Sequence, residues 1–319
     1  MNNLDNWYNT DEILKIYSKF KNKELVSLNQ SKENIFNLKF LEYRFNETTN
    51  YLPVNSYSSL NIISSSSIDK LEKIIEEISL KNITTLYLPL ISKFNLKEAL
   101  PNKLKDIFSE RLNSYYIDLK NTEDQLKKNI SKKNRKSTEL SKSFYEFNIA
   151  TKEEENYFFE LYSNFMSSVG ANNSQFINSF FMKEILKLDN NFLFCLKVNK
   201  EIQLMHLIGI NQKNDNADFV FAASKNNGHS YGYLMLWNEI IFLKSLGFKT
   251  FFLGGGVRKN DGIDNFKKKL GGEVLYNGGL KLVVDQKNYL KEINNFPTSN
   301  ENSSFFPFYL KDQIFKKTI

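Results

Sequence analysis

Cysteine, histidine and long apolar runs are scarce in this chain of 319 residues. Its single cysteine, Cys195, excludes an intrachain disulfide and a cysteine-based zinc cluster, and the surrounding FLFCLKV indicates a buried core residue. No His, Asp and Glu spacing suggests a metal site. No segment approaches the roughly 18 apolar residues of a membrane-spanning helix, and Met1 to Phe20 has no signal-peptide core. We therefore expect a cytoplasmic protein that uses no metal.

Two further absences limit the chemistry and the architecture. There is no nucleophile-elbow motif for Ser/His/Asp catalysis, and no segment has the sustained heptads of a coiled coil. Lys+Arg 43 against Asp+Glu 36 gives a net charge of +7, which suits a phosphate-bearing partner. The chain is also rich in Lys, Asn, Ile, Phe and Tyr, the residues of AT-rich codons, so the charge alone does not identify a partner.

What is present is a hydrophobic content of 41% and a regular alternation of helical and strand patterns. This alternation predicts an α/β fold with a sheet covered by helices, and the length allows about two domains. Helices are expected at 11–20, 68–80, 152–169, 176–188 and 233–246. Strands are expected at 35–47, 83–88, 115–119, 145–150, 192–198, 202–210, 218–223 and 249–253, with Pro89 ending the second of them.

The stretch from Lys225 to Gly272 carries most of the functional signal. It reads as a small-residue loop, a helix, a short strand, a glycine turn at 254–256 and a second helix. The loop at 228–232 opens a helix, and free N–H groups at a helix start suit a phosphate. The second helix is predicted to be capped by Asp261 and to pack through one apolar face. That face consists of Ile263, Phe266 and Leu270.

Two motifs in this stretch resemble a known family. Asn227, Ser230 and Gly232 stand where GNAT acyltransferases have the pyrophosphate loop Q/R-x-x-G-x-G/A. The run GIDNFKKKLGG after the glycine turn resembles the C-terminal signature of the FemAB-like branch of that superfamily. The resemblance covers roughly Asp118 to Val284. It implies a GNAT fold, with a mixed sheet flanked by helices and two tandem GNAT-like domains: a degenerate domain at 1–120 and a catalytic domain at 121–319.

A basic helix is predicted at 122–142, where the second domain begins. Thr122 and Gln125 form a capping box, and lysines and an arginine crowd the helix surface. The FemAB-like branch has a similar basic helix here. One interpretation is contact with the phosphates of a donor or an acceptor; the other is a solvated helix face. The basic residues are Lys127, Lys128, Lys132, Lys133, Arg135 and Lys136.

Acyl transfer to an amine requires a placed carbonyl, donors for the oxyanion and a route for the amine proton. In the FemAB peptidyltransferases a Phe-Lys pair sits by the acyl ester, and by resemblance Phe266 and Lys267 inherit that place. Lys267 is the best catalytic candidate, with a surface lysine in a KKK run as the alternative. Lys268 and Lys269 are expected at the surface.

The remaining candidates each have a structural alternative. His206, in IQLMHLIGI, is either a satisfied core residue or the natural general base. Asp261 caps the second helix or binds the amine, and Glu239 is expected to be solvated. The donor, acetyl-CoA or another acyl-CoA, is assigned to the loop together with Phe266. The loop residues are Asn227, Gly228, His229, Ser230, Tyr231 and Gly232; His229 has an exposed loop residue as its alternative.

Three functions remain open. The first is an N-acyltransferase that moves an acyl group from acyl-CoA to an amino group of a nucleotide-sugar, a polysaccharide or another cell-envelope precursor. The second is a FemAB-type transferase that adds an amino acid from an aminoacyl-tRNA to a cell-wall precursor. The third is a non-catalytic, basic binding module on a GNAT scaffold. The degenerate loop weakens the first, and the missing coiled-coil arm removes one tRNA contact from the second.

Overall fold

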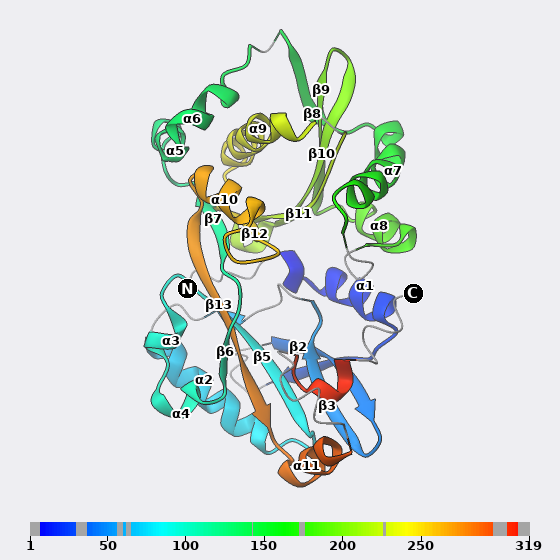
Figure 1. Cartoon of the computed structure of the whole chain (residues 1–319), viewed down its shortest axis with the longest axis vertical. Helices are drawn as coiled ribbons and strands as arrows, with labels where there is room; N and C mark the ends of the chain where they lie inside the picture. The colour runs from blue at the N-terminus through cyan, green and yellow to red at the C-terminus, as the bar shows by residue number, and fades with distance from the viewer. Residues whose placement is uncertain are drawn as a thin grey trace. The chain divides into compact units, whose positions relative to one another are not determined.

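The computed structural model describes residues 7–29, 37–55, 60–61, 65–141, 143–171, 176–225, 228–295 and 305–311. The chain forms two compact units (Figure 1), of which unit 1 contains Met1–Ile13 and Leu112–Val274, and unit 2 contains Leu14–Arg111 and Leu275–Ile319. The sequence predicts a single boundary at residue 120 instead. The difference arises because the last strand returns to the N-terminal sheet, while the first residues pack in unit 1. None of the described helices is long and apolar enough to span a bilayer.

Unit 2 is built on the buried strand β5 (Thr85–Ser92), which pairs antiparallel with β13 (Glu273–Val283) and parallel with β3 and β4. The helix α2 supplies Leu71, Ile74 and Ile78 to the core against β5. The other elements of this unit are α1 (Asp11–Lys21), whose first three residues belong to unit 1, β1 (Leu25–Asn29), β2 (Asn37–Phe45), β3 (Thr48–Pro53), β4 (Leu60–Asn61), α2 (Ser65–Ser79), α3 (Leu96–Ala99), α4 (Asn102–Lys105), β6 (Phe108–Glu110), α11 (Gln286–Asn294) and η7 (Phe308–Leu310).

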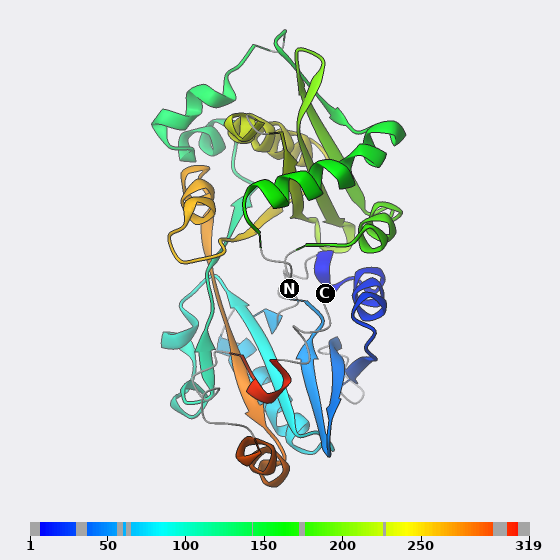
Figure 2. The same ribbon diagram turned by 45° about the vertical axis from the view of Figure 1, so that its right-hand side comes forward.

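Unit 1 contains a mixed sheet in the order β7-β12-β11-β10-β9-β8. Helix α9 covers one face of its strands, and α7 and α8 cover the other (Figures 1 and 2). The elements are η1 (Trp7–Asn9), β7 (Ser114–Asp118), α5 (Glu123–Asn129), α6 (Lys132–Arg135), η2 (Lys136–Thr138), β8 (Tyr145–Ile149), α7 (Lys152–Ser168), α8 (Ser179–Leu186), β9 (Asn191–Val198), β10 (Glu201–Asn211), η4 (Gln212–Asn214), β11 (Asn216–Ser224), η5 (Gly228–Tyr231), α9 (Gly232–Ser245), β12 (Thr250–Gly255) and α10 (Gly262–Lys269).

Strands β11 and β12 start together and then separate. They pair in parallel from Asn216 to Asp218 and from Thr250 to Phe252. Beyond Asp218, β11 keeps its antiparallel partner β10, with a bulge opposite Leu207 and Ile208, while β12 follows β7 to Gly255. A bulge increases the local twist of a strand, which favours this separation. The two strands therefore diverge beyond Asp218 and Phe252.

Two local predictions were wrong. Pro89 does not end its strand, since β5 runs through it to Ser92; Pro89 falls between the short stretches that pair with β3 and β4. The basic segment at 122–142 is not one helix, because Ile130 is extended and buried and separates α5 from α6. The capping box of Thr122 and Gln125 is present as predicted.

Trp7 is fully buried on the sheet of unit 1, on the face that α7 and α8 cover. Its backbone N–H donates to the carboxylate of Asp218 at 2.8 Å. Its ring lies flat on Gly209, where an added Cβ would be 2.3 Å from the indole. Gly209 is therefore glycine because an aromatic ring occupies the space of a side chain.

Gly209→Ala is expected to displace Trp7 and to destabilise unit 1 by about 1–3 kcal/mol, the usual cost of overpacking a core. The change should appear as a red shift of tryptophan emission and a lower denaturation midpoint. Gly262→Ala is the matched control, because no atom lies within 4 Å of its added Cβ. Equal stability of the two variants would contradict this packing.

Candidate functional site

The loop between β11 and α9 is held tightly against β10. Lys225 N–H donates to the carbonyl of Gln203 at 3.0 Å, and an added Cβ at Gly228 would be 2.2 Å from that same oxygen. Any side chain at position 228 would therefore clash with the backbone of β10, which explains the glycine there. Asn227 lies outside the described residues, as does the side chain of His229.

The start of α9 is covered by α10. Gly232 is buried as the first residue of α9, and a Cβ there would touch the ring edge of Phe266 at 3.3 Å. The ring of Tyr233 also packs on Phe266, with centroids 4.5 Å apart. The structure thus brings together Gly232 and Phe266, two of the predicted donor-binding residues. Ser230 is exposed, and Tyr231 packs against the core.

Positive charge gathers beside this helix start. The segment η2 packs against α9, and Asn134 of α6 hydrogen-bonds Tyr233. Lysines at 132, 133 and 136 are exposed in the same segment. A helix N-terminus carries a partial positive charge, and neighbouring ammonium groups add to it. The arrangement is suited to an anion such as a pyrophosphate.

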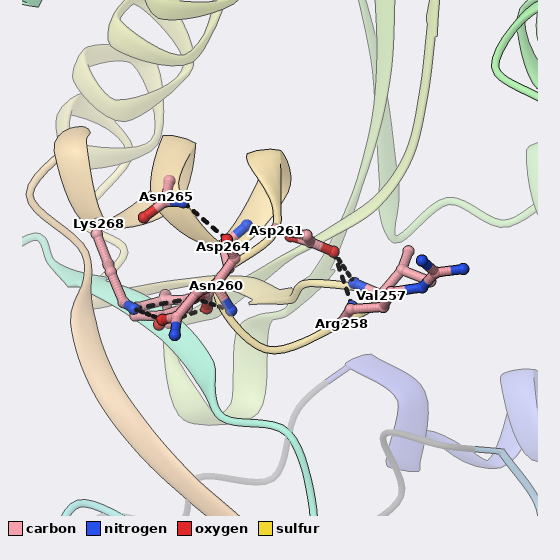
Figure 3. A network of polar contacts seen from close by, with 8 residues as sticks. Val257, Arg258, Asn260, Asp261, Asp264, Asn265 and Lys268 are labelled. Atoms are coloured by element: carbon pink, nitrogen blue, oxygen red, sulfur yellow. Dashed lines mark hydrogen bonds and ion pairs between the residues drawn. The ribbon is translucent and has the colours of Figure 1, made fainter.

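Asp261 is the N-cap of α10 and has several donors around it (Figure 3). Its carboxylate accepts N–H groups from Asp264, Val257 and Arg258 at 2.7, 2.7 and 2.8 Å. Burial acts to raise its pKa, but these backbone hydrogen bonds outweigh burial and hold the pKa below the ordinary value. The carboxylate is thus already engaged by backbone, which fits the capping interpretation from the sequence.

Lys267 is buried, with 9% of its surface exposed, and its ammonium donates to the carbonyl of Gly255 at 2.7 Å. Gly255 is the last residue of β12, on the diverging side of the strand pair. Burial lowers the pKa of Lys267 to about 8, against the opposing charges of Asp261 and Asp264. A lysine with this pKa is charged at neutral pH and sits at the edge of the divergence.

The buried face of α10 differs from the prediction. Ile263 is 46% exposed, and Asp264 takes its place beside Lys267 and Leu270. Asp264 accepts the hydroxyl of Tyr115 at 2.5 Å and the ammonium of Lys268 at 2.8 Å. These hydrogen bonds, which Figure 3 shows in part, place Asp264 toward β7 and leave Ile263 exposed.

His206 lies on β10 and contacts α9. Its Nδ1 is 2.8 Å from Oε1 of Glu239, and both residues are buried. The prediction that Glu239 is solvated was wrong, because α9 is apolar on nearly every side and Glu239 is completely inaccessible. His206 contacts Glu239 and Phe219, whereas Lys267 contacts Gly255, so the two candidates occupy different places along the divergence.

Sequence reasoning missed a second buried acid, Asp218. It lies in the last residue pair before β11 and β12 separate. Burial raises its pKa to about 7, while the hydrogen bond from Trp7 acts in the opposite direction. The available signal was weak: an aspartate inside an apolar strand, without any hint of its partner 211 positions away. In the described part of the chain, no three His, Cys, Asp or Glu side chains cluster to hold a metal ion.

Comparisons with known proteins identify the fold. No protein-family model and no curated protein matches the chain. The crystal structure of FemX aligns with a TM-score of 0.64 at 12% identity, covering 89% of this chain and 94% of that chain. L-PGS from Bacillus licheniformis reaches 0.49 at 11% identity, covering 89% and 95%. A GCN5-related N-acetyltransferase from Kribbella flavida reaches 0.37 at 10%, covering 84% and 95%.

The fold class predicted from the sequence is confirmed in its α/β architecture, a mixed sheet flanked by helices, and the chain shares its fold with FemX. An identity of 12% shows the fold and leaves the activity to be argued from the site.

Proposed function

We propose that this chain is an N-acyltransferase of the FemAB-like branch. It takes an acyl group from acyl-CoA, such as acetyl-CoA, and transfers it to an amino group of a nucleotide-sugar, a polysaccharide or another cell-envelope precursor. The observation that carries the proposal is the divergence of β11 and β12 directly before the loop and α9. Backbone groups freed by the divergence can bind an extended donor arm, and the start of α9 its pyrophosphate.

In this proposal the donor contacts are the loop from Asn227 to Gly232 and the ring of Phe266. Lys267 neutralises charge that builds on the acyl oxygen, or holds a phosphate beside it. The amine attacks the thioester carbonyl, the C–S bond breaks, and the amine gives up one proton. His206 is the proposed acceptor of that proton. Asp261 fixes the helix that carries Lys267, or binds the amine.

The exposed lysines of α6 and η2 favour one alternative. A basic surface beside the donor site also suits the phosphates of a tRNA, so a FemAB-type transfer from aminoacyl-tRNA remains the second candidate. Native mass spectrometry with acetyl-CoA, and separately with a charged tRNA, distinguishes the two. Binding of acetyl-CoA with acyl transfer to an amine panel supports the first. Binding of neither donor supports a non-catalytic module.

Gly232→Ala is expected to weaken acetyl-CoA binding about tenfold, the loss of roughly one hydrogen bond. The added Cβ meets Phe266 at 3.3 Å and shifts the helix start by a few tenths of an ångström. Calorimetry measures the affinity. Gly262→Ala, at the first residue of α10, is the control with open space around its Cβ. Unchanged affinity in Gly232→Ala would remove the loop from the donor site.

A further inference from the structure

Only one of the two carboxylate oxygens of Glu239 has a hydrogen-bond partner among the described residues. Oε1 of Glu239 is 2.8 Å from Nδ1 of His206, but the buried Oε2 has no hydrogen-bond partner among the described residues. A buried polar atom without a partner destabilises the fold. An apolar side chain of similar size would avoid this cost, since Glu239 lies among the leucines and isoleucines of α9. The presence of a carboxylate at this position points to a role that an apolar residue cannot perform.

The position of the pair suggests that role. The His206 ring packs edge-on against Phe219, with centroids 4.9 Å apart. Phe219 is the first residue of β11 beyond its last pair with β12. The imidazole therefore lies next to the divergence. Nδ1 contacts Glu239, so Nε2 is the ring nitrogen that this contact does not engage.

We propose that Glu239 is a positioning residue that holds His206 in the Nδ1–H tautomer, so that Nε2 is the nitrogen that accepts the proton of the acceptor amine. This inference rests on the proposed function for its chemical meaning. The amine nitrogen bonds to the acyl carbon, the C–S bond breaks, and the coenzyme leaves as a thiolate. The amine proton moves to Nε2, which forms an imidazolium beside Glu239, and it is then passed to the thiolate or to water.

The burial of Glu239 changes the electrostatics of the pair. It raises the pKa of Glu239, and the charge and hydrogen bond of His206 act in the opposite direction. A lone buried carboxylate is costly, and the contact with the imidazole of His206 offsets part of that cost. On the elements packed around α9, Tyr145 of β8 hydrogen-bonds Asn238, and Lys244 of α9 donates to the carbonyl of Leu119.

The tautomer can be measured directly, without any substrate. The chain has two histidines, so histidine-specific ¹⁵N labelling gives two ring systems, and His229→Asn assigns them. Long-range ¹H–¹⁵N correlation spectra of the whole chain should show His206 with a protonated Nδ1 and an unprotonated Nε2 above neutral pH. Glu239→Gln keeps an oxygen acceptor and should keep this tautomer. Glu239→Leu removes it and should switch the dominant signal to the Nε2–H form. Glu160→Gln, exposed on α7, is the control and should change nothing.

An Nε2–H tautomer in the parent chain would overturn the inference, and that measurement requires no variant to fold. So would a Glu239→Leu spectrum identical to that of the parent. Acyl-transfer assays test the proposed function separately. The expected tautomer in a chain that transfers no acyl group would refute the function and leave the pairing intact. A chain that turns over with the same pH profile in Glu239→Leu would refute the positioning role.

Discussion

Lys267→Met is expected to lower turnover about a hundredfold to a thousandfold, the usual loss when one oxyanion-stabilising group is removed. The side chain keeps its length and loses only its charge. Its ammonium sits at the end of β12, 2.7 Å from the carbonyl of Gly255, and has further N–H groups for a ligand oxygen. Release of free thiol from acetyl-CoA in the presence of an amine panel measures the turnover.

The same substitution is expected to leave stability unchanged or to raise it at neutral pH. The folded-state pKa of Lys267, about 8, lies below the unfolded value of about 10.4. A depressed lysine pKa means that the unfolded chain binds more protons between these values. Stability is therefore reduced at pH 7 by up to about 3 kcal/mol, and the deficit shrinks as the pH rises through this window. Methionine avoids the deficit but forfeits the hydrogen bond to Gly255.

Lys269→Met is the control for Lys267→Met, because Lys269 is an exposed residue two positions along the same helix. Lys268 is unsuitable, since its ammonium bonds Asp264 and Asn260 and helps to anchor α10. Loss of activity in Lys267→Met alone, with an unchanged or higher melting temperature, supports a functional lysine kept at a cost to stability. If Lys267→Met turned over like the parent, the role of Lys267 would be structural, through its hydrogen bond to Gly255.

The regular elements could be predicted from the sequence because each has a local cause. The strands of unit 1 follow from short β-prone runs, and the cap of α10 follows from Asp261 three residues before Asp264. The apolar pattern predicted the wrong buried residue on α10. Ile263 was expected to be buried, but it is exposed, and Asp264 is buried instead.

The rest of the site depends on contacts between distant positions. Glu239 reads as a surface residue on a helical wheel, and only the packing of α9 on β10 shows that His206 is its partner. The bounds of the two units could not be predicted because β13 returns to pair with β5, which lies far back in the chain. Gly209 and Trp7 appear unrelated until the ring is seen on the glycine.

Asp218→Asn is expected to stabilise the chain at pH 8 by up to about 4 kcal/mol, and the gain should fade toward pH 5. The pKa of Asp218 is raised from an unfolded value of about 3.9 to about 7, because the carboxyl group is buried beside Trp7. A raised folded pKa means that the folded chain binds more protons in this window. The contribution of this group to stability is complete below the unfolded pKa and is lost as the pH rises through about 7.

An asparagine keeps an oxygen for the N–H of Trp7 and has no charge to bury, so its stability does not follow this titration. Thermal unfolding of the parent and Asp218→Asn from pH 5 to pH 8, followed by tryptophan fluorescence, gives the difference at each pH. Asp189→Asn, an exposed aspartate of the same unit, removes the same charge and should show no such trend. A stability difference that does not change with pH would mean that Asp218 is not the group that titrates. Activity measured alongside shows whether this carboxyl, at the last paired position before the strands separate, is kept for the reaction at the expense of stability.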